Sequence, residues 1–228
     1  MLLAVCCSLR SVALTRPLLE PSSVGRAPWV KVAVDNDLPL PDDEDVLRAV
    51  GMRPERAIMQ QFLWSDDWGD TQKLAFEHFE NKAECLRTHA FEPSEGVIQW
   101  LTLLKQYEVP CCFASGTEFD KAAAEQIMAK AGLTEYFTSC VTAEDGCETV
   151  EQTYLVGSIK VRRPPSRCVV FEDDPKGVAA AHEATNKVVA INNGRHGADL
   201  RHAEIRVTDF SDLSLMSLRN LFKDAPPI

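Results

Sequence analysis

The chain has 228 residues, 45% of them hydrophobic, and its 24 Lys and Arg against 34 Asp and Glu give a formal net charge of -10. This length suits one α/β core with a smaller accessory unit, and the hydrophobic content excludes a wholly disordered chain. The negative charge argues against nucleic acid or an anionic membrane as the main partner, and no apolar run approaches the roughly 18 residues of a membrane span.

Residues 1–28 differ from the rest of the chain in composition. They contain Arg10, Arg16 and Arg26, a single acid at Glu20 and no Lys. A segment that contains Arg and Ser and is poor in acids is typical of an organelle transit peptide. The short apolar run at residues 2–7 leaves secretion as a rival interpretation, and a disordered tail without a targeting role is the third.

The first strand that we predict is a short apolar run at residues 31–34, which ends in Asp35-Asn36-Asp37. From residue 45 to about residue 86, apolar side chains recur at spacings of three and four, which predicts helices. A further helix is predicted from residue 97. Residues 109–114 then predict a strand that ends at Ser115 and Gly116.

The second half of the chain alternates helices and strands. The predicted helices are residues 119–130, 151–161, 177–184 and 214–222, and the predicted strands are residues 137–142, 168–171, 188–191 and 205–207. This alternation predicts a parallel sheet with helices on both faces, with a ligand site at the carboxyl ends of the strands. Asp35, Asp37, Ser115, Glu172 and Asp173 all follow predicted strands, so we expect them to meet at that edge.

The eight cysteines include no C-x-x-C pair, and Cys111, Cys112 and Cys168 lie in apolar, strand-like runs. Cysteine in such a run is usually a small buried hydrophobe. We therefore predict free thiols in a reducing compartment and no disulfide scaffold.

Three consecutive carboxylates, Glu172, Asp173 and Asp174, directly follow the apolar run at residues 168–171. Acidic side chains delivered by a buried strand are costly unless a cation lies beside them. Their oxygen atoms suit a hard divalent ion, and we predict Mg²⁺. The alternative is a strand followed by a solvated acidic loop.

This layout resembles the haloacid dehalogenase-like (HAD) hydrolases, and more narrowly their β-phosphoglucomutase/CbbY-like members, over residues 30–222. It is also similar to the plastid HAD-like phosphatases of plants and algae. The resemblance implies an α/β Rossmannoid core with a parallel sheet, helices on both faces and a small, shortened helical cap. We accordingly divide the chain into a transit peptide or tail at residues 1–28, a first core strand and motif at 29–41, a cap at 42–92 and the remaining core at 93–228.

The resemblance also implies roles for the residues at the predicted edge. Asp35 would be the nucleophile that attacks phosphorus and Asp37 the general acid/base, while Ser115 and Gly116 would bind the substrate phosphate. Glu172 and Asp173 would hold Mg²⁺ together with Asp35 and the backbone carbonyl of Asp37.

Two departures from the family pattern weaken this assignment. Leu38-Pro39 replaces the glycine that usually follows the first pair of aspartates, and a Leu resists the tight turn that a Gly allows. The lysine of the family's third motif is also absent. Glu148 stands in its place, or Cys147 with a shift of one residue, and no Lys occurs between Lys130 and Lys160. Such a positive charge is commonly worth 10²-fold or more in rate.

Two functional hypotheses follow. The first is a Mg²⁺-dependent phosphatase that acts on a small phosphorylated metabolite through an aspartyl-phosphate intermediate. The second is a catalytically impaired HAD-fold protein with a binding or assembly role, which would then have a protein partner. A third possibility is a gene model in which part of the cap has been spliced out or mispredicted, which would explain the short cap. The resemblance favours a plastid location, with a mitochondrion as the alternative.

Overall fold

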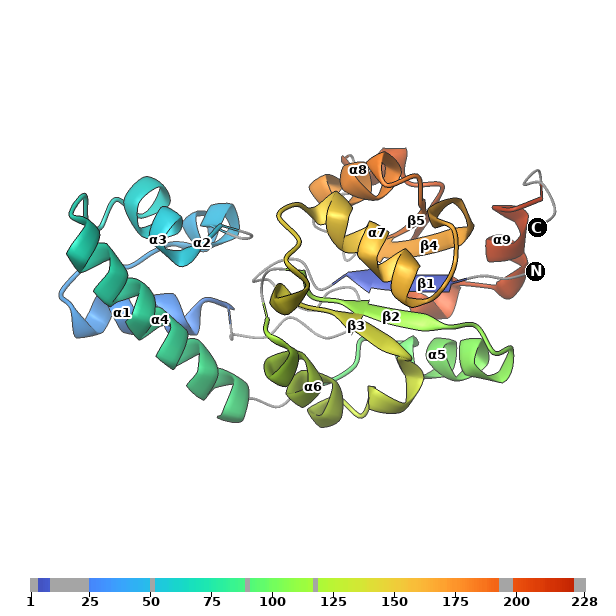
Figure 1. Cartoon of the computed structure of the whole chain (residues 1–228), viewed down its shortest axis with the longest axis horizontal. Coiled ribbons are helices and arrows are strands. Elements are labelled where there is room, and N and C mark those ends of the chain that lie inside the picture. Colours follow the sequence, from blue (N-terminus) through green and yellow to red (C-terminus); the bar gives the residue numbers. More distant parts are fainter. Residues whose placement is uncertain are drawn as a thin grey trace.

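The computed structural model describes residues 4–8, 25–49, 52–88, 91–116, 119–192 and 199–223. Figure 1 shows two units, an α/β core and a smaller helical unit beside it. The predicted fold class, with a parallel sheet between two layers of helices and a small helical cap, is confirmed. Within the described residues, no helix combines the length and apolar character needed to cross a membrane.

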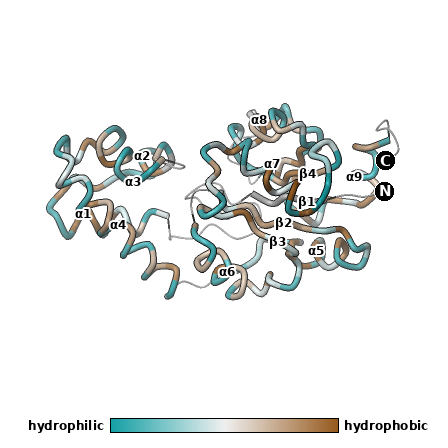
Figure 2. The backbone as a smooth tube through the Cα atoms, in the orientation of Figure 1, coloured by the Kyte–Doolittle hydropathy of each residue, from teal (hydrophilic) through white to brown (hydrophobic). Residues whose placement is uncertain are grey.

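The core is built on a six-stranded parallel sheet with the strand order β3-β2-β1-β4-β5-β6. The strands are short, and β2, β4 and β5 are mostly buried on both faces, so these three consist largely of small and β-branched apolar residues. Figure 2 shows this hydrophobic character along β2 and β4. The strands are β1 (Ala4–Ser8), β2 (Cys111–Ala114), β3 (Ser139–Val141), β4 (Cys168–Glu172), β5 (Lys187–Ile191) and β6 (Ile205–Val207).

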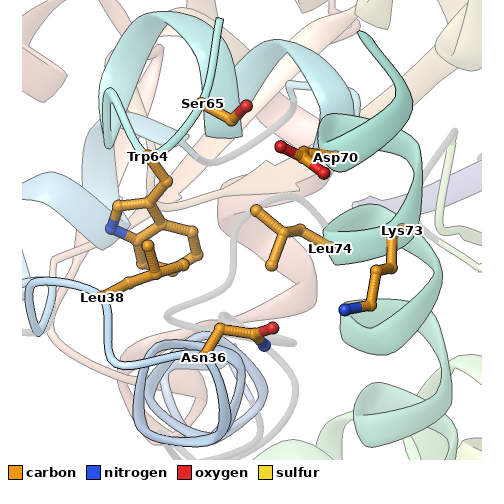
Figure 3. A pocket seen from close by; sticks show the side chains of 7 residues that line it. All are labelled: Asn36, Leu38, Trp64, Ser65, Asp70, Lys73 and Leu74. Carbon is orange, nitrogen blue, oxygen red and sulfur yellow. The ribbon is translucent and has the colours of Figure 1, made fainter. Parts of the chain in front are cut away.

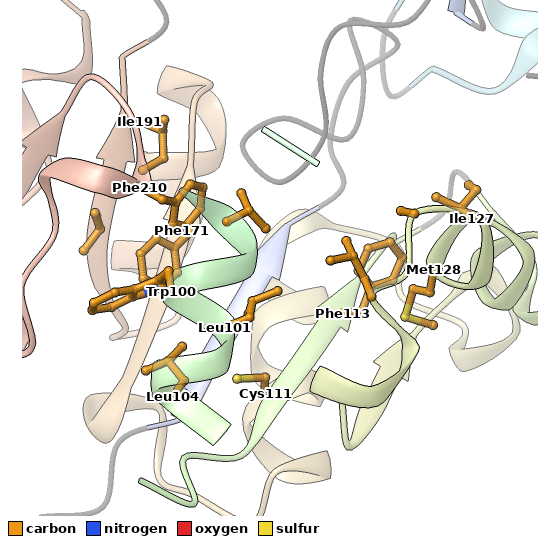
Figure 4. Packing of buried hydrophobic residues seen from close by; sticks show 14 of the residues in the cluster. Trp100, Leu101, Leu104, Cys111, Phe113, Ile127, Met128, Phe171, Ile191 and Phe210 are labelled. Atoms are coloured by element: carbon orange, nitrogen blue, oxygen red, sulfur yellow. The ribbon is translucent and has the colours of Figure 1, made fainter. Parts of the chain in front are cut away.

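Alternate residues of the strands face two separate helical layers. On one face, Phe113 and Phe171 pack with Trp100 and Leu101 of α5 in the cluster drawn in Figure 4. On the other face, Val170 packs with side chains from α7 and α8. The core helices are α5 (Val97–Gln106), α6 (Lys121–Lys130), α7 (Val150–Lys160), α8 (Pro175–Glu183) and α9 (Leu215–Asn220), and short 3-10 turns join several of the elements.

The helical unit consists of α1 (Ala27–Asp35), α2 (Asp43–Ala49), α3 (Pro54–Arg56), which continues into a π-helical turn (Ala57–Gln61), and α4 (Trp68–Thr88). Its own core includes Trp29, Val32, Ile58 and Leu74, so the unit buries an apolar cluster separate from those of the sheet. The carboxyl-terminal half of α4 meets the core. Lys82 lies 4.4 Å from the ring centre of Phe119, and Lys130 donates hydrogen bonds to the carbonyl oxygens of Leu86 and Arg87.

The strand predicted at residues 31–34 is wrong, because these residues lie within helix α1. Pro28 occupies the first turn, where its missing N–H costs nothing and its fixed φ favours a helix. Trp29, Val32 and Ala33 are buried at the three-and-four spacing of a helix, whereas Val34 is 60% exposed. A run this short does not distinguish a helix from a strand by its apolar residues alone.

The first strand of the core is instead Ala4–Ser8, which lies at the centre of the sheet between β2 and β4. The prediction that residues 1–28 form a tail apart from the core is therefore wrong for residues 4–8, and residues 9–24 lie outside the described part of the chain. The expected boundary at residues 29–41 is also wrong, because α1 belongs to the helical unit. The sequence predicts a short cap because residues 31–34, which belong to the first helix of the helical unit, are expected there to form a core strand.

Candidate ligand site at the carboxyl edge of the sheet

The carboxyl ends of β2, β1 and β4 lie side by side at one edge of the sheet. Ser8 pairs with Ala114 on one side, and Cys7 pairs with Phe171 on the other. The backbone of Ser8 therefore lies between the end of β2, which Ser115 follows, and Glu172 at the end of β4. In the sequence, Ser8 is followed by Leu9 and Arg10, which lie outside the described residues. No carboxylate ends this central strand.

Ser115 and Gly116 follow β2 directly, as the sequence predicted, and both are buried. The Ser115 hydroxyl donates a hydrogen bond to the Val141 carbonyl oxygen at 2.9 Å. Gly116 has a φ of 57°, in the left-handed region, and a Cβ there would lie 3.2 Å from Oγ1 of Thr153 on α7. The left-handed φ and the close approach to Thr153 both favour glycine here, and the small residue brings this turn close to the first turns of α7.

Glu172 at the end of β4 is fully buried, and protein donors satisfy both of its carboxylate oxygens. The Tyr154 hydroxyl donates to Oε1, and the backbone N–H groups of Asp173 and Asp174 donate to Oε2 at 3.1 and 3.4 Å. A Cβ at position 177 would overlap the Glu172 carboxyl group, so Gly177 leaves the space that this side chain fills. Contacts from α7, from the turn after β4 and from Gly177 on α8 therefore hold the Glu172 side chain in place.

Asp174 shapes the turn after β4, because its Oδ1 accepts a hydrogen bond at 2.8 Å from the N–H of Lys176 and caps α8. Aspartate at this position satisfies one of the N–H groups that a helix leaves free at its start. Asp173 lies between this capping residue and the buried Glu172. The acidic stretch thus lies at the sheet edge, where Glu172 is buried in the core and Asp174 caps α8.

Lys160 does not replace the lysine that is missing near residue 148. Its ammonium lies 2.6 Å from Oδ1 of Asp145 and donates to the Cys140 carbonyl oxygen at 2.7 Å. Burial raises the pKa of Asp145, but hydrogen bonds from Lys160 and from the Thr142 N–H, together with the Lys160 charge, lower it by more. Lys160 is thus committed to an ion pair. Glu148 precedes the N-cap of α7, and its N–H donates to Oε1 of Gln152 at 2.7 Å.

Asp35 and Asp37 do not join the other predicted site residues. Asp35 is the last residue of α1, and its Oδ2 accepts a hydrogen bond from Lys31, one helical turn earlier, at 2.5 Å. Asp37 follows with a φ of 53° in the turn that leaves the helix. Since α1 packs against α4 in the helical unit (Figure 1), both aspartates lie away from the sheet edge that holds Ser115 and Glu172.

The residues at this edge do not fit the Mg²⁺ site that the resemblance implies. Two of its four expected ligands, Asp35 and Asp37, belong to the helical unit. Both oxygens of Glu172 already accept hydrogen bonds from protein donors, whereas Mg²⁺ demands near-octahedral oxygen coordination. Across the described ranges, no group of three His, Cys, Asp or Glu side chains is arranged to hold a metal ion.

Tyr154, Thr153 and Gly177 complete the site, and the sequence analysis assigned a role to none of them. The sequence places Gly177 at the start of one predicted helix and Tyr154 within another. The sequence carries no signal that links Tyr154 to Glu172, because the contact depends on how α7 packs over β4.

Comparisons with known proteins agree with this fold. A family model described as haloacid dehalogenase-like hydrolase matches residues 29–191. A chloroplastic 5-amino-6-(5-phospho-D-ribitylamino)uracil phosphatase of Arabidopsis thaliana is 23% identical over 85% of this chain, which spans only 52% of that protein. The fructose-1-phosphate phosphatase YqaB of Escherichia coli (strain K12) is 30% identical over 48% of this chain and 59% of its own length.

Solved structures show the same fold at low sequence identity. A family IA, variant 3 HAD hydrolase from Entamoeba histolytica HM-1:IMSS has a TM-score of 0.81 and 18% identity, with 98% of this chain and 100% of that chain covered. A β-phosphoglucomutase from Clostridium difficile has a TM-score of 0.77 and 15% identity, with 97% of each chain covered. The narrower resemblance to the β-phosphoglucomutase fold is therefore confirmed.

Proposed function

The chain belongs to the haloacid dehalogenase-like hydrolase family, and from that premise we propose that it binds a small phosphorylated metabolite without hydrolysing it through an aspartyl-phosphate. The end of β1 carries this proposal. The strand between β2 and β4 ends at Ser8, and no Asp or Glu precedes Glu20 in the sequence. The sequence offers a serine and no carboxylate at the end of this strand, so the carboxylate attack implied by the resemblance has no group at this position.

The relatives and the turn after β2 support a phosphorylated ligand. The two curated relatives are named as phosphatases of a phosphoribityl compound and of fructose 1-phosphate. In this chain, the glycine turn at Gly116 approaches Thr153 in the first turns of α7, whose N-cap is Thr149. Free N–H groups at the start of a helix favour a phosphate group. Lys160, which could have added positive charge, is paired with Asp145.

We further propose that binding does not require Mg²⁺. The Glu172 carboxylate accepts hydrogen bonds on both oxygens, and the Gly177 backbone lies against it. A buried carboxylate with this many donors is stabilised without a metal ion. Glu172 then acts as a structural anchor that joins β4, α7 and α8.

The test uses the full chain and a panel of sugar and nucleotide phosphates that includes fructose 1-phosphate. Binding is measured by isothermal titration calorimetry, and phosphate release is measured in parallel, each with Mg²⁺ and with EDTA. We expect binding without release, and the same affinity in both buffers. Ser115→Ala is expected to weaken binding about tenfold, because it removes a hydroxyl from the turn that receives the phosphate.

Ser158→Ala is the matched control, because Ser158 is also a fully buried serine whose hydroxyl donates to a backbone carbonyl, that of Tyr154, at 2.9 Å. It lies on α7 and does not follow a strand of the sheet edge. Equal loss of binding in both variants would mean that Ser115 acts only through stability. Failure of every phosphorylated compound to bind the folded chain would overturn the proposal.

The second candidate function is a phosphatase, and the names of the relatives favour it. It predicts Mg²⁺-dependent phosphate release from one of the panel compounds. Release that disappears in Asp35→Asn would restore Asp35 as the nucleophile and would contradict the first proposal. A protein partner, expected if the chain is inactive, stays a prediction.

A plastid location is also a proposal, supported by the chloroplastic relative. Residues 4–8 cannot be both removed on import and present as the central strand of the sheet. We therefore expect the protein purified from plastids to retain them. Mass spectrometry of its amino terminus tests this expectation, and a mature chain that begins after residue 8 would contradict the strand assignment.

A further inference from the structure

The helical unit contains a pocket that is separate from the sheet edge. Asn36 and Leu38, which follow α1, form one side of it, Trp64 and Ser65 form a second, and α4 closes it with Asp70, Lys73 and Leu74. Its volume is about 180 Å³. Figure 3 shows Asp70 and Ser65 on one side of the opening, Asn36 on the other, and Leu74 between them.

This pocket lies at the end of the helical unit that points away from the core. Asp70 and Lys73 belong to the first two turns of α4, whereas Lys82, Leu86 and Arg87 near its other end make the contacts with the core. A helix rises 1.5 Å per residue, so about 18 Å of helix separates Asp70 from Lys82. A ligand in this pocket would therefore not touch Ser115 or Glu172.

The walls of the pocket are held in place by contacts behind them. The indole N–H of Trp64 donates to the Pro39 carbonyl oxygen at 3.1 Å, and its ring stacks on Phe62 with ring centres 4.6 Å apart. Behind them, Trp29 stacks on His78 at 3.6 Å. A ring fixed in this way presents a preformed apolar surface, which lowers the entropy cost of binding a ligand.

The polar groups of the pocket offer both acceptors and a donor. The Asn36 side chain uses its NH₂ group to donate to the Val32 carbonyl at 3.0 Å and to Glu77 at 2.6 Å, which turns its carbonyl oxygen toward other donors. Among the described residues, the Asp70 carboxylate accepts no side-chain hydrogen bond. Lys73 supplies an ammonium group whose charge is partly balanced by Glu77, 3.9 Å away.

We propose that this pocket binds a small uncharged polyol, such as a monosaccharide or a cyclitol. The hydroxyl groups of such a ligand donate to Asp70 and Asn36 and accept from Lys73, while its apolar C–H face lies on Trp64. Asp70 would repel an anionic ligand, and Lys73 would repel a cationic one. The volume admits a molecule of monosaccharide size but not a nucleotide.

The experiment measures binding of D-glucose and myo-inositol to the full chain by saturation-transfer NMR and calorimetry, with glucosamine and gluconate as charged comparison compounds. The pocket is open and two of its polar groups are exposed, so the titration extends to millimolar ligand concentration. We expect binding of at least one neutral polyol, and binding of each charged compound to be at least about tenfold weaker.

Asp70→Ala and Lys73→Gln are each expected to weaken polyol binding about tenfold, because each removes one hydrogen-bonding group of the pocket. Asp66→Ala is the matched control, since Asp66 is an exposed acid four residues before Asp70 that does not line the pocket, and binding should stay within twofold. Both test residues are largely exposed, so the variants fold. No binding of either polyol, tighter binding of a charged compound, or equal effects of Asp70→Ala and Asp66→Ala would overturn the proposal.

Discussion

Tyr154 and Glu172 are 18 residues apart in the chain and joined by a hydrogen bond in the core, where the Tyr154 hydroxyl donates to Oε1 of a fully buried carboxylate. This contact ties α7 to the end of β4. Because the same carboxylate also receives two backbone N–H groups, Glu172 joins the end of β4 both to α7 and to the turn before α8.

The first prediction concerns this hydrogen bond. Tyr154→Phe should lower the free energy of unfolding by about 1.5–3 kcal/mol, because it leaves one oxygen of a buried carboxylate without its donor. Urea unfolding of the full chain measures the loss. Tyr136→Phe is the control, since its hydroxyl meets Thr102 at 3.2 Å at a partly buried site, and it should cost about 0.5–1.5 kcal/mol. Equal losses would show that Glu172 does not depend on Tyr154.

The second prediction concerns the space beside Glu172. Gly177→Ala should lower the free energy of unfolding by about 1–3 kcal/mol, because the added methyl group overlaps the Glu172 carboxyl group. In a background that already carries Glu172→Ala, the same substitution should cost nothing further, and the helix propensity of Ala should make it slightly favourable. A double-mutant cycle by urea unfolding measures the coupling. Additive effects in the cycle would show that Gly177 and Glu172 do not interact.

The third prediction concerns the pH dependence of stability. Burial, and after it the charge of Lys82, lowers the pKa of His78 to about 3 from its usual value of 6.5. In the unfolded chain His78 takes up a proton below about pH 6.5, and in the folded chain it does so only near pH 3. The folded state therefore loses up to about 1.4 kcal/mol for each pH unit as the pH falls through this window.

His78→Phe keeps a ring against Trp29 and removes the titrating group, so the contribution of this residue to the slope should vanish. Urea unfolding at pH 7.5, 5.5 and 4.5 measures the slope of wild type and variant. His202→Phe replaces an exposed histidine and serves as the control, with the slope of the wild type expected. If His78→Phe also keeps the wild-type slope, the buried imidazole is not its cause.

The sequence predicted most of the core but not its first strand. From residue 97 onward the predicted order of helices and strands is confirmed, because apolar strands of three to five residues alternate with longer helices. The error arose at two short apolar runs of similar composition. The sequence predicts a strand at residues 31–34 and a transit peptide or tail over the run that includes Ala4–Ser8, whereas the structure has a helix and a strand there. Only the pairing of β1 with both β2 and β4 distinguishes them.

The same error decided how much of the site was predicted. Ser115, Gly116, Glu172 and Asp173 all lie at the predicted sheet edge, since each follows a strand that the sequence shows plainly. Asp35 and Asp37 have the spacing of a catalytic pair but lie at the end of a helix. A spacing of two residues between carboxylates does not report which element carries them, so the sequence could not show that this pair lies at the end of a helix.

The fourth prediction follows from the place of Asp35. Asp35→Asn should leave both ligand binding and any phosphate release unchanged, because Asp35 pairs with Lys31 on the surface of α1, away from the sheet edge. Loss of one exposed pair of this kind costs about 0.3–0.5 kcal/mol. Glu44→Gln, which removes the equivalent pair with Arg48 on α2, is the matched control. A large loss of function in Asp35→Asn alone would return Asp35 to the active site.

The fifth prediction is a gain of function. Ser8→Asp introduces an aspartate as the last residue of β1, the strand between β2 and β4, and Glu148→Lys supplies the positive charge that is missing near α7. A carboxylate nucleophile with a neutralising cation is the arrangement that the family resemblance implies. The double variant should release phosphate from fructose 1-phosphate at least about tenfold faster than the wild type when Mg²⁺ is present.

The control for this gain is Ser8→Asn with Glu148→Lys, which has the same size and positive charge but no nucleophilic carboxylate. It should remain at the rate of the wild type, whereas adding Asp35→Asn to the double variant should change nothing. Circular dichroism must show that all the variants are folded. Equal rates in the Ser8→Asp and Ser8→Asn backgrounds would mean that the residue ending β1 does not face the bound phosphate, and the assignment of this strand end as the lost catalytic position would then be wrong.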